Sequence, residues 1–189
     1  MDLSILRKEK MKTEIISAFG HESELKELFR EYTDMLVEAD PKFKAYLDLQ
    51  HYDDELKDLN KKYGPPEGRL YIVYCDGKPA GCIGLKRLNG TDCELKRLYV
   101  RPEFRGHHLS SRLIDIIISD ARQIGYKRIR LDTLPPLKSA IHVYKKFGFC
   151  ETPAYLQSPM EDSIYMCLDL CPVTSNQWIA AQDQLSPQI

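Results

Sequence analysis

Residues 101–113, RPEFRGHHLSSRL, are of types that together suit the binding of an anion. If a helix begins near His107, the N–H groups of its first turn lack partners within the helix and carry partial positive charge. Gly106 would let the backbone approach a phosphate closely, and Arg105 would add a charge-assisted contact. The hydroxyls of Ser110 and Ser111 would be further donors. The stretch predicts a phosphate site, although a strand, turn and helix with one glycine also occur where nothing binds.

Periodic patterns around this loop predict the elements that would hold it. The strand CELKRLYV at 93–100 ends directly before the loop, and an amphipathic helix follows from Leu109, with Gly125 placed to end it. The patterns predict these further elements: strands at 13–19, 69–75, 78–88, 127–133, 149–154 and 163–170, a helix with Ser23 as its N-cap, a weaker helix within 42–60, and a helix at 136–147. The resulting order, β-α-α-β-β-β-α-β-α-β-β, indicates an α/β domain.

Two dipeptides predict how the three middle strands are joined. Asp76-Gly77 and Asn89-Gly90 each separate two strand-like runs. Both dipeptides tolerate positive φ at the two central positions of a tight turn. The three strands therefore read as an antiparallel meander.

The composition is that of an ordinary globular protein, with 189 residues, 43% hydrophobic and 29% charged. No run approaches the roughly 20 apolar residues of a membrane helix, and the N-terminus lacks the apolar core of a signal peptide. We expect a cytoplasmic protein without membrane contact, with a leader at 1–12, one domain at 13–170 and a tail at 171–189. The tail is either loose or anchored by Trp178 and Ile179.

The cysteines and histidines do not have the spacing of a metal site. Six cysteines stand mostly in apolar, strand-like stretches without CxxC spacing, which is typical of buried free thiols. His107 and His108 are adjacent, and neighbours on a helix do not share a face. We therefore expect no metal.

Charge is unevenly distributed along the chain. Residues 96–130 hold nine basic and three acidic residues, whereas 22–60 hold twelve acidic and five basic residues. The two regions would suit an anionic ligand and a cationic one, or they are two solvated faces. The basic region alternates with long apolar runs and has no recognition helix with base-reading residues, so nucleic-acid binding is not expected.

The stretch CELKRLYVRPEFRGHHLSSRLI, followed by AIHVYKKFGF, closely resembles the GCN5-related N-acetyltransferases, the GNAT superfamily. The resemblance covers roughly 13–170 and includes the order of elements. It implies the α/β GNAT fold: a central, mixed, mostly antiparallel twisted sheet of about six or seven strands with about four helices, in which two splayed strands form the acetyl-CoA cleft. It also implies transfer of the acetyl group of acetyl-CoA to a primary amine by direct attack, without a metal.

In that family a loop of pattern R/Q-x-x-G-x-G/A holds the coenzyme A pyrophosphate through backbone amides. Here His108 stands where the family has glycine, and Ser110 where it has glycine or alanine. Because the donors are main-chain groups and a first turn in the αR region needs no positive φ, we expect the loop to bind the pyrophosphate despite these two differences. Carried over, the pantetheine arm lies along the strand before the loop, opposite a strand ending at Asp132 and Thr133. The resemblance assigns these residues to the coenzyme: Leu98, Tyr99, Val100, Arg105, Gly106, His107, His108, Leu109, Ser110 and Ser111.

The resemblance also implies catalytic roles. Tyr144 matches the family tyrosine that protonates the departing thiolate, and its alternative role is aromatic packing under Phe147 and Phe149. Glu94 matches a glutamate used as a general base, often through water, and otherwise reads as a strand glutamate paired with a lysine or arginine. The backbone N–H near Val100 would contact the oxyanion. Leu137 replaces an asparagine common in the family, and His142 is expected at the surface.

The acceptor is the least specified part of this hypothesis. In the superfamily the first two helices and the last strands usually wall the acceptor site, and here the helical region is acidic, which favours a cationic amine. The acceptor would be a small molecule or a peptide, and GNAT domains often pair as homodimers. The alternative is a non-catalytic acyl-CoA-binding or regulatory module on the same scaffold.

Overall fold

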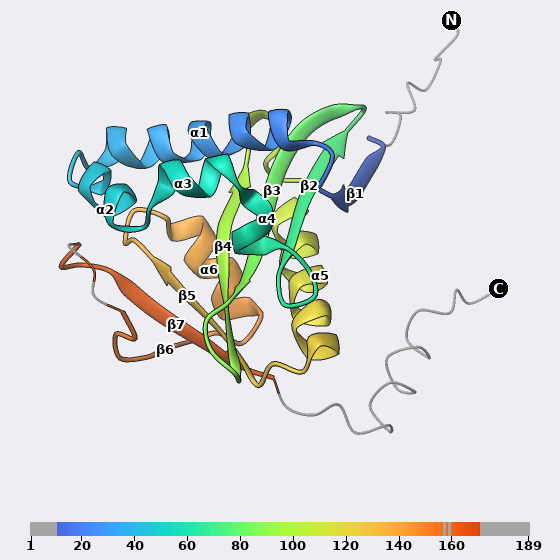
Figure 1. The fold of residues 1–189 in the computed structure, drawn as a ribbon. Helices are drawn as coiled ribbons and strands as arrows, with labels where there is room; N and C mark the ends of the chain where they lie inside the picture. Colours follow the sequence, from blue (N-terminus) through green and yellow to red (C-terminus); the bar gives the residue numbers. More distant parts are fainter. Residues whose placement is uncertain (1–10, 157, 159, 171–189) are drawn as a thin grey trace, which may run out of the picture.

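The computed structural model describes residues 11–156, 158 and 160–170, so most of the expected leader and the whole expected tail lie outside the described residues. A seven-stranded sheet in the order β1-β2-β3-β4-β5-β7-β6 forms its centre (Figure 1). The strands are β1 (Thr13–Ser17), β2 (Arg69–Cys75), β3 (Lys78–Arg87), β4 (Asp92–Val100), β5 (Arg128–Thr133), β6 (Cys150–Glu151) and β7 (Ile164–Asp169). All neighbouring strands are antiparallel except β4 and β5, which are parallel.

Helices cover both faces of the sheet (Figure 1). The helices are α1 (Glu22–Ala39), α2 (Phe43–Leu49), α3 (Tyr52–Lys57), α4 (Leu59–Tyr63), α5 (Leu109–Ile124) and α6 (Lys138–Lys146). The helices α1 to α4 lie on one face, and α5 and α6 on the other. No helix in these described ranges has the length and apolar character needed to cross a membrane.

Two layers of apolar side chains hold the helices to the sheet. Leu113, Ile114 and Ile117 of α5 are fully buried against the sheet, as the helical spacing of apolar residues predicts. On the other face Leu25, Phe29 and neighbouring residues of α1 pack on β2 and β3. Each such side chain contributes about 1.5–3 kcal/mol by its burial.

The predicted strands and the two long helices are confirmed, with boundaries shifted by a few residues, but the region 42–60 is different. In place of one weak helix there are three short helices over residues 43–63, namely α2, α3 and α4. His51 takes a left-handed φ of 53°, and Asp58 is non-helical with φ −140°, so the chain bends at both positions. The Asp58 side chain then caps α4 by accepting from the Lys61 N–H.

Two local predictions were wrong in detail. Helix α1 begins at Glu22 after His21, so Ser23 is not its N-cap; the Glu22 carboxylate accepts from the Gly20 N–H. The Asp76-Gly77 turn has positive φ at both residues, as expected. Neither Asn89 nor Gly90 has positive φ; instead, the Asn89 side chain accepts from the N–H groups of Thr91 and Asp92 and closes the turn.

The cysteines are only partly as expected. Cys75, Cys82 and Cys93 are buried free thiols, but Cys150 is exposed and Cys167 half-buried. Cys171 lies outside the described residues.

Candidate active site

Strands β4 and β5 pair over only part of their length, and a cleft lies where they separate. They pair only where Asp92–Glu94 lies beside Arg128–Arg130. Beyond that point β4 continues to Val100 without β5, while β5 keeps its partner β7 to its end at Thr133. A cleft of about 510 Å³ lies between the end of β4 that no longer pairs with β5, the start of α5 and helix α6.

A bulge in β4 directs charged residues to one side of this region. Arg97 has φ +57°, and the β3–β4 register shifts between the pairs Gly84↔Lys96 and Cys82↔Tyr99. The extra residue breaks the alternation of side chains along the strand. Arg97 reaches toward the face covered by α1 and α3, whereas Leu98 packs in the core under α5 and α6.

The loop between β4 and α5 presents a row of unused backbone donors. Among the described residues, none of the six consecutive N–H groups from Gly106 to Ser111 donates a hydrogen bond, and the first donor of the helix is the N–H of Arg112, to His108 O. Gly106 has φ +83° and nothing within 4 Å of where a Cβ would lie, so the backbone there is open. These features suit an anion at the positive end of α5.

His108 differs from our expectation. The helix begins at Leu109, and His108 precedes it with φ 58° and ψ 20°, in the left-handed region. The position therefore requires a positive φ, which explains why glycine suits it, and the expected αR conformation was wrong. A non-glycine residue in this conformation costs about 1–2 kcal/mol.

The cleft brings together almost all the residues that the sequence assigned to a coenzyme. Its lining includes Leu98, Tyr99, Val100, Arg105, Gly106, His108, Leu109, Ser110, Ser111 and Tyr144. His107 is exposed and does not line it. Arg105 donates from Nε to Val100 O at 3.2 Å, so its side chain joins the loop to the end of β4.

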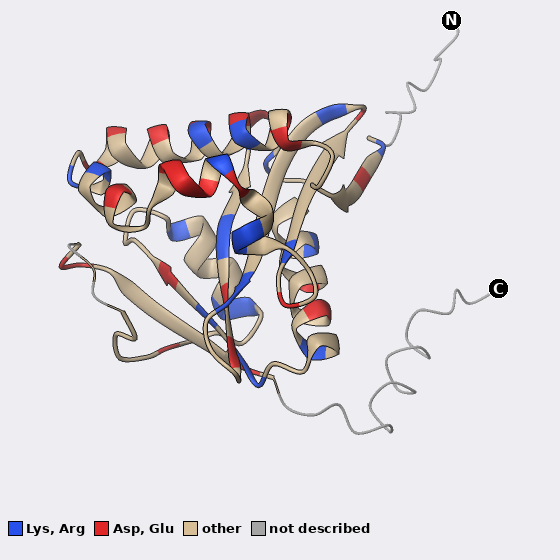
Figure 2. Ribbon diagram, in the orientation of Figure 1, with Lys and Arg blue, Asp and Glu red and all other residues tan. Residues whose placement is uncertain are grey.

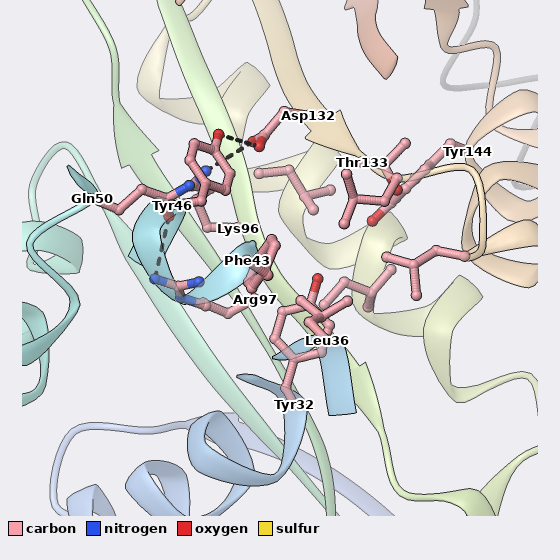
Figure 3. A pocket seen from close by; sticks show the side chains of 14 residues that line it. Tyr32, Leu36, Phe43, Tyr46, Gln50, Lys96, Arg97, Asp132, Thr133 and Tyr144 are labelled. Carbon is pink, nitrogen blue, oxygen red and sulfur yellow. Dashed lines mark hydrogen bonds and ion pairs between the residues drawn. The ribbon is translucent and has the colours of Figure 1, made fainter. Parts of the chain in front are cut away.

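A second, smaller cavity of about 40 Å³ adjoins the cleft on the side of α1 and α2 (Figure 3). It is lined by Tyr32, Leu36, Phe43, Tyr46, Gln50, Leu95, Lys96, Arg97, Leu98, Asp132, Thr133, Leu134, Leu137 and Tyr144. Four residues line both cavities: Tyr32, Leu98, Leu137 and Tyr144. These four mark the junction of the cavities, and the two tyrosines are its polar side chains.

Tyr144 is held on α6 with its ring against Phe149, at 5.7 Å between centroids. Its side chain is 6% exposed, and burial raises the pKa of the phenol well above its ordinary value. The phenol is therefore protonated at neutral pH. Its two predicted roles are compatible here, since the residue both packs and lines the two cavities.

Glu94 lies outside both cavities and is engaged in ion pairs. Its Oε1 accepts from the Tyr155 hydroxyl at 2.7 Å, and Lys86 Nζ lies 2.7 Å from Oε2. Lys96 Nζ lies 3.6 Å from Oε1. Burial alone would raise the pKa of this carboxyl, but Lys96 and Lys86 outweigh it and lower the pKa. This geometry matches the alternative role of Glu94, a strand glutamate paired with lysines.

Asp132 forms the polar floor of the small cavity. Its Oδ1 accepts from Lys96 Nζ at 2.8 Å and its Oδ2 from the Tyr46 hydroxyl at 2.6 Å (Figure 3). Burial raises the pKa of Asp132, but the charge of Lys96 and both hydrogen bonds lower it below its ordinary value. Asp132 is thus a carboxylate with both oxygens already engaged.

The basic and acidic regions of the sequence pair with each other across the interface of β4 with α1 and α3. Glu55 of α3 accepts from Arg97 Nε at 2.9 Å and from Nη2 at 2.8 Å. Arg101 donates to Glu31 and Glu27 of α1. The remaining carboxylates of α1 mostly lie along its outer side, away from the cavities (Figure 2). Of the basic residues in 96–130, Arg105 alone lines the large cleft, and Lys96 and Arg97 the small one.

Comparison with known proteins accounts for this arrangement. A profile described as the Acetyltransferase (GNAT) family matches residues 24–149. The chain belongs to this family. An uncharacterized N-acetyltransferase of Schizosaccharomyces pombe is 40% identical over 126 residues, which cover 66% of this chain and 77% of the relative. The spermidine N(1)-acetyltransferase of Escherichia coli is 26% identical and is matched over 57% of this chain and 55% of its own length.

Solved structures share the fold of this GNAT chain. An acetyltransferase of Streptococcus agalactiae superposes with a TM-score of 0.68 at 24% identity, over 84% of this chain and 98% of that one. An N-acetyltransferase of Thermoplasma acidophilum, in complex with coenzyme A, does so with a TM-score of 0.64 at 17% identity, over 84% and 99%. These structures confirm the predicted fold, and the family match with its N-acetyltransferase relatives confirms the predicted acyltransferase class.

Sequence reasoning missed several residues of this GNAT site. Lys138 and Ser139 line the cleft from the start of α6, and Tyr32 lines both cavities from α1. Tyr32 belongs to the apolar stripe that predicted α1, so the same pattern that placed the helix concealed the residue. His142 is exposed, as expected.

Proposed function

We propose that this acetyltransferase uses acetyl-CoA and transfers its acetyl group to a primary amine by direct attack. The observation that carries the proposal is the row of six unused N–H groups from Gly106 to Ser111, at the mouth of a cleft between two splayed strands. A diphosphate is the anion that such a row accommodates, because successive amides and the helix dipole act on the same oxygens.

The residues of the cleft fit coenzyme A. The pyrophosphate would lie on Gly106 to Ser111, next to Arg105, and Lys138 is a further cation in the lining of the cleft. The pantetheine arm would follow the main chain of Leu98 to Val100, whose hydrogen-bonding edge is released where β5 departs. The acetyl thioester would then reach the junction of the two cavities, next to Tyr144.

Transfer requires a neutral amine, a donor for the carbonyl oxygen and an acid for the thiolate. We assign the acid to Tyr144, whose raised pKa keeps its phenol protonated, and the oxyanion contact to a backbone N–H near Val100. Glu94 receives no proton-accepting role, because it lies outside the cavities and is paired with lysines. It instead holds Lys96, which in turn holds Asp132.

For the acceptor we propose a primary amine whose reactive end enters the small cavity. A cationic acceptor is supported by the exposed carboxylates of α1 and by the spermidine in the name of the E. coli relative. The inward carboxylates Glu55 and Glu31 are neutralised by arginines, so any preference for cations arises outside the small cavity.

The test combines acceptor screening with direct binding. Release of free coenzyme A from acetyl-CoA is measured with panels of cationic, neutral and anionic amines, and acetyl-CoA binding is measured by calorimetry. We expect turnover with a cationic amine, and a fall of about tenfold or more in acetyl-CoA affinity for Gly106→Val, because a side chain with two γ-methyls obstructs the backbone and disfavours φ +83°.

Gly90→Val is the matched control, because Gly90 lies in a turn outside the cleft with nothing within 4 Å of a Cβ. Tight acetyl-CoA binding without turnover across the panel would instead favour the non-catalytic module. A clear preference for anionic amines would contradict the cationic acceptor.

A further inference from the structure

Two phenols, Tyr32 and Tyr144, lie together where the cleft meets the small cavity. They reach this place from opposite faces of the sheet, Tyr32 from α1 and Tyr144 from α6 (Figure 3). Both line both cavities. Tyr32 lies close enough to Tyr144 that a charge on one phenol raises the pKa of the other.

Both hydroxyls are available at this junction. Among the described residues, neither phenol has a hydrogen-bond partner, and neither hydroxyl is a fully enclosed polar atom. The Tyr32 and Tyr144 hydroxyls therefore open onto the cavities. Each ring is fixed by aromatic packing, Tyr32 against Tyr99 at 5.7 Å and Tyr144 against Phe149 at 5.7 Å.

The proposed reaction must move a proton from the attacking nitrogen to the departing sulfur, and none of the described residues that line the small cavity is a free base. Asp132 is occupied by Lys96 and Tyr46. Lys96 and Arg97 are cations whose pKa values are raised by their carboxylate partners. The ionisable groups close enough for their charges to change the pKa of Tyr32 are Arg97, Asp132, Lys96 and Cys82.

We propose that Tyr32 and Tyr144 form a proton relay that carries the proton from the amine to the thiolate. This inference rests on the proposed function. The amine nitrogen of the neutral acceptor forms the C–N bond and the C–S bond breaks. The nitrogen's proton passes to Tyr32 Oη, the proton of Tyr32 passes to Tyr144 Oη directly or through one water, and that of Tyr144 passes to sulfur. Both phenols end as they began, and the products are the amide and coenzyme A thiol.

A relay suits phenols in this environment better than separate acid and base roles do. Burial raises the pKa of Tyr32 to about 12 and that of Tyr144 well above its ordinary value, so a free phenolate at either site is costly. In a concerted relay each phenol gains one proton as it loses another. Arg97 and Lys96 stabilise any transient negative charge on Tyr32.

The test uses Tyr32→Phe, Tyr144→Phe and the double variant in single-turnover reactions, which separate chemistry from product release. We expect each single variant to lower the transfer rate by about 10²-fold. The double variant should be about as slow as either single one, because one missing link already stops the relay. Acetyl-CoA affinity should change little, since phenylalanine keeps both ring contacts.

Tyr52→Phe is the matched control, because its hydroxyl contacts Thr33 and it lines neither cavity. It should transfer at the wild-type rate. For the wild type, a plot of the transfer rate against the deuterium fraction in mixtures of H2O and D2O should be curved, as expected when several protons move together. For Tyr32→Phe the rates should be lower and the plot nearly linear.

The outcomes separate the relay from the function on which it rests. If Tyr32→Phe transfers acetyl at the wild-type rate, the relay alone is overturned. The same holds if the double variant is slowed by the product of the two single-variant factors. A wild type that acetylates no amine of the panel would overturn the proposed function and the relay with it.

Discussion

At the scale of single residues, His108 shows how an unfavourable conformation is retained in a binding loop. Its φ of 58° is required because the chain must turn between Gly106 and the start of α5. The neighbouring N–H groups are thereby left without partners, and the strain is localised at the point where the anion would bind.

We expect His108→Val to lower the free energy of unfolding by about 1–2 kcal/mol, because a β-branched residue tolerates a left-handed φ poorly. The free energy of unfolding of His108→Gly should equal or exceed that of the wild type, since the relieved strain offsets the added freedom of the unfolded chain. Urea unfolding measures both. His107→Val, at an exposed position without positive φ, is the control and should be nearly neutral. Equal stabilities for His108→Val and His108→Gly would contradict the argument.

At the scale of elements, the cleft depends on how closely β3 supports the end of β4. A Cβ at Gly81 would overlap the carbonyl oxygen of Tyr99 and lie 3.1 Å from the Val100 Cα. Both are backbone atoms of the segment that edges the cleft, so they cannot move aside as a flexible side chain would. The glycine in β3 therefore allows the end of β4 to lie this close to β3, where it borders the cleft.

We expect Gly81→Ala to destabilise the protein by about 1–3 kcal/mol and to weaken acetyl-CoA binding, because β4 must shift. Thermal unfolding and calorimetric titration with acetyl-CoA measure the two effects. Gly90→Ala, with open space around its Cβ, should alter neither. Binding that survives intact in Gly81→Ala would show that the end of β4 is not part of the coenzyme site.

At the scale of the whole molecule, one buried ion pair joins the helical layer to the sheet at the bulge. Glu55 of α3 and Arg97 of β4 are both almost completely buried, and the Arg97 guanidinium also lies over the rings of Tyr52 and Phe29, at 5.0 and 5.8 Å from their centroids. Burial raises the pKa of Glu55, but its hydrogen bonds to Arg97 and the charges of Arg97 and Lys62 lower it to about 2.

This pair makes stability dependent on acidity. Because the folded pKa lies below the unfolded one, the stabilisation is fully present above pH 4.5 and is lost as the pH falls toward 2. The shift from 4.5 to about 2 corresponds to about 3 kcal/mol. We expect unfolding free energy, measured by denaturant titration, to fall over this range.

Glu55→Gln should be less stable at pH 7 by about 3–5 kcal/mol, since it leaves Arg97 buried without its counter-ion, and its acid dependence should be shallower. Asp54→Asn, the neighbouring residue in an exposed pair with Lys57, should behave as the wild type. Equal effects of the two substitutions would show that burial of the pair does not matter.

Local patterns in the sequence were sufficient for most elements and for the loop. Helical and alternating periodicities placed α1, α5 and the strands of the meander, because those periods follow directly from backbone geometry. The loop from Arg105 to Ser111 was found because its donors are main-chain groups adjacent in the chain.

Other features depend on residues that are distant in the chain. The junction of Tyr32 with Tyr144, the pairing of Glu55 with Arg97, and the engagement of Glu94 by Lys86 and Tyr155 each join separate elements. Whether a charged or phenolic group is free or hydrogen-bonded depends on which partners the packed sheet and helices bring to it. The spacing of residues along one strand or helix does not predict those partners. The periodicity of the chain thus specified where the elements are, and packing decided which of their side chains face the two cavities.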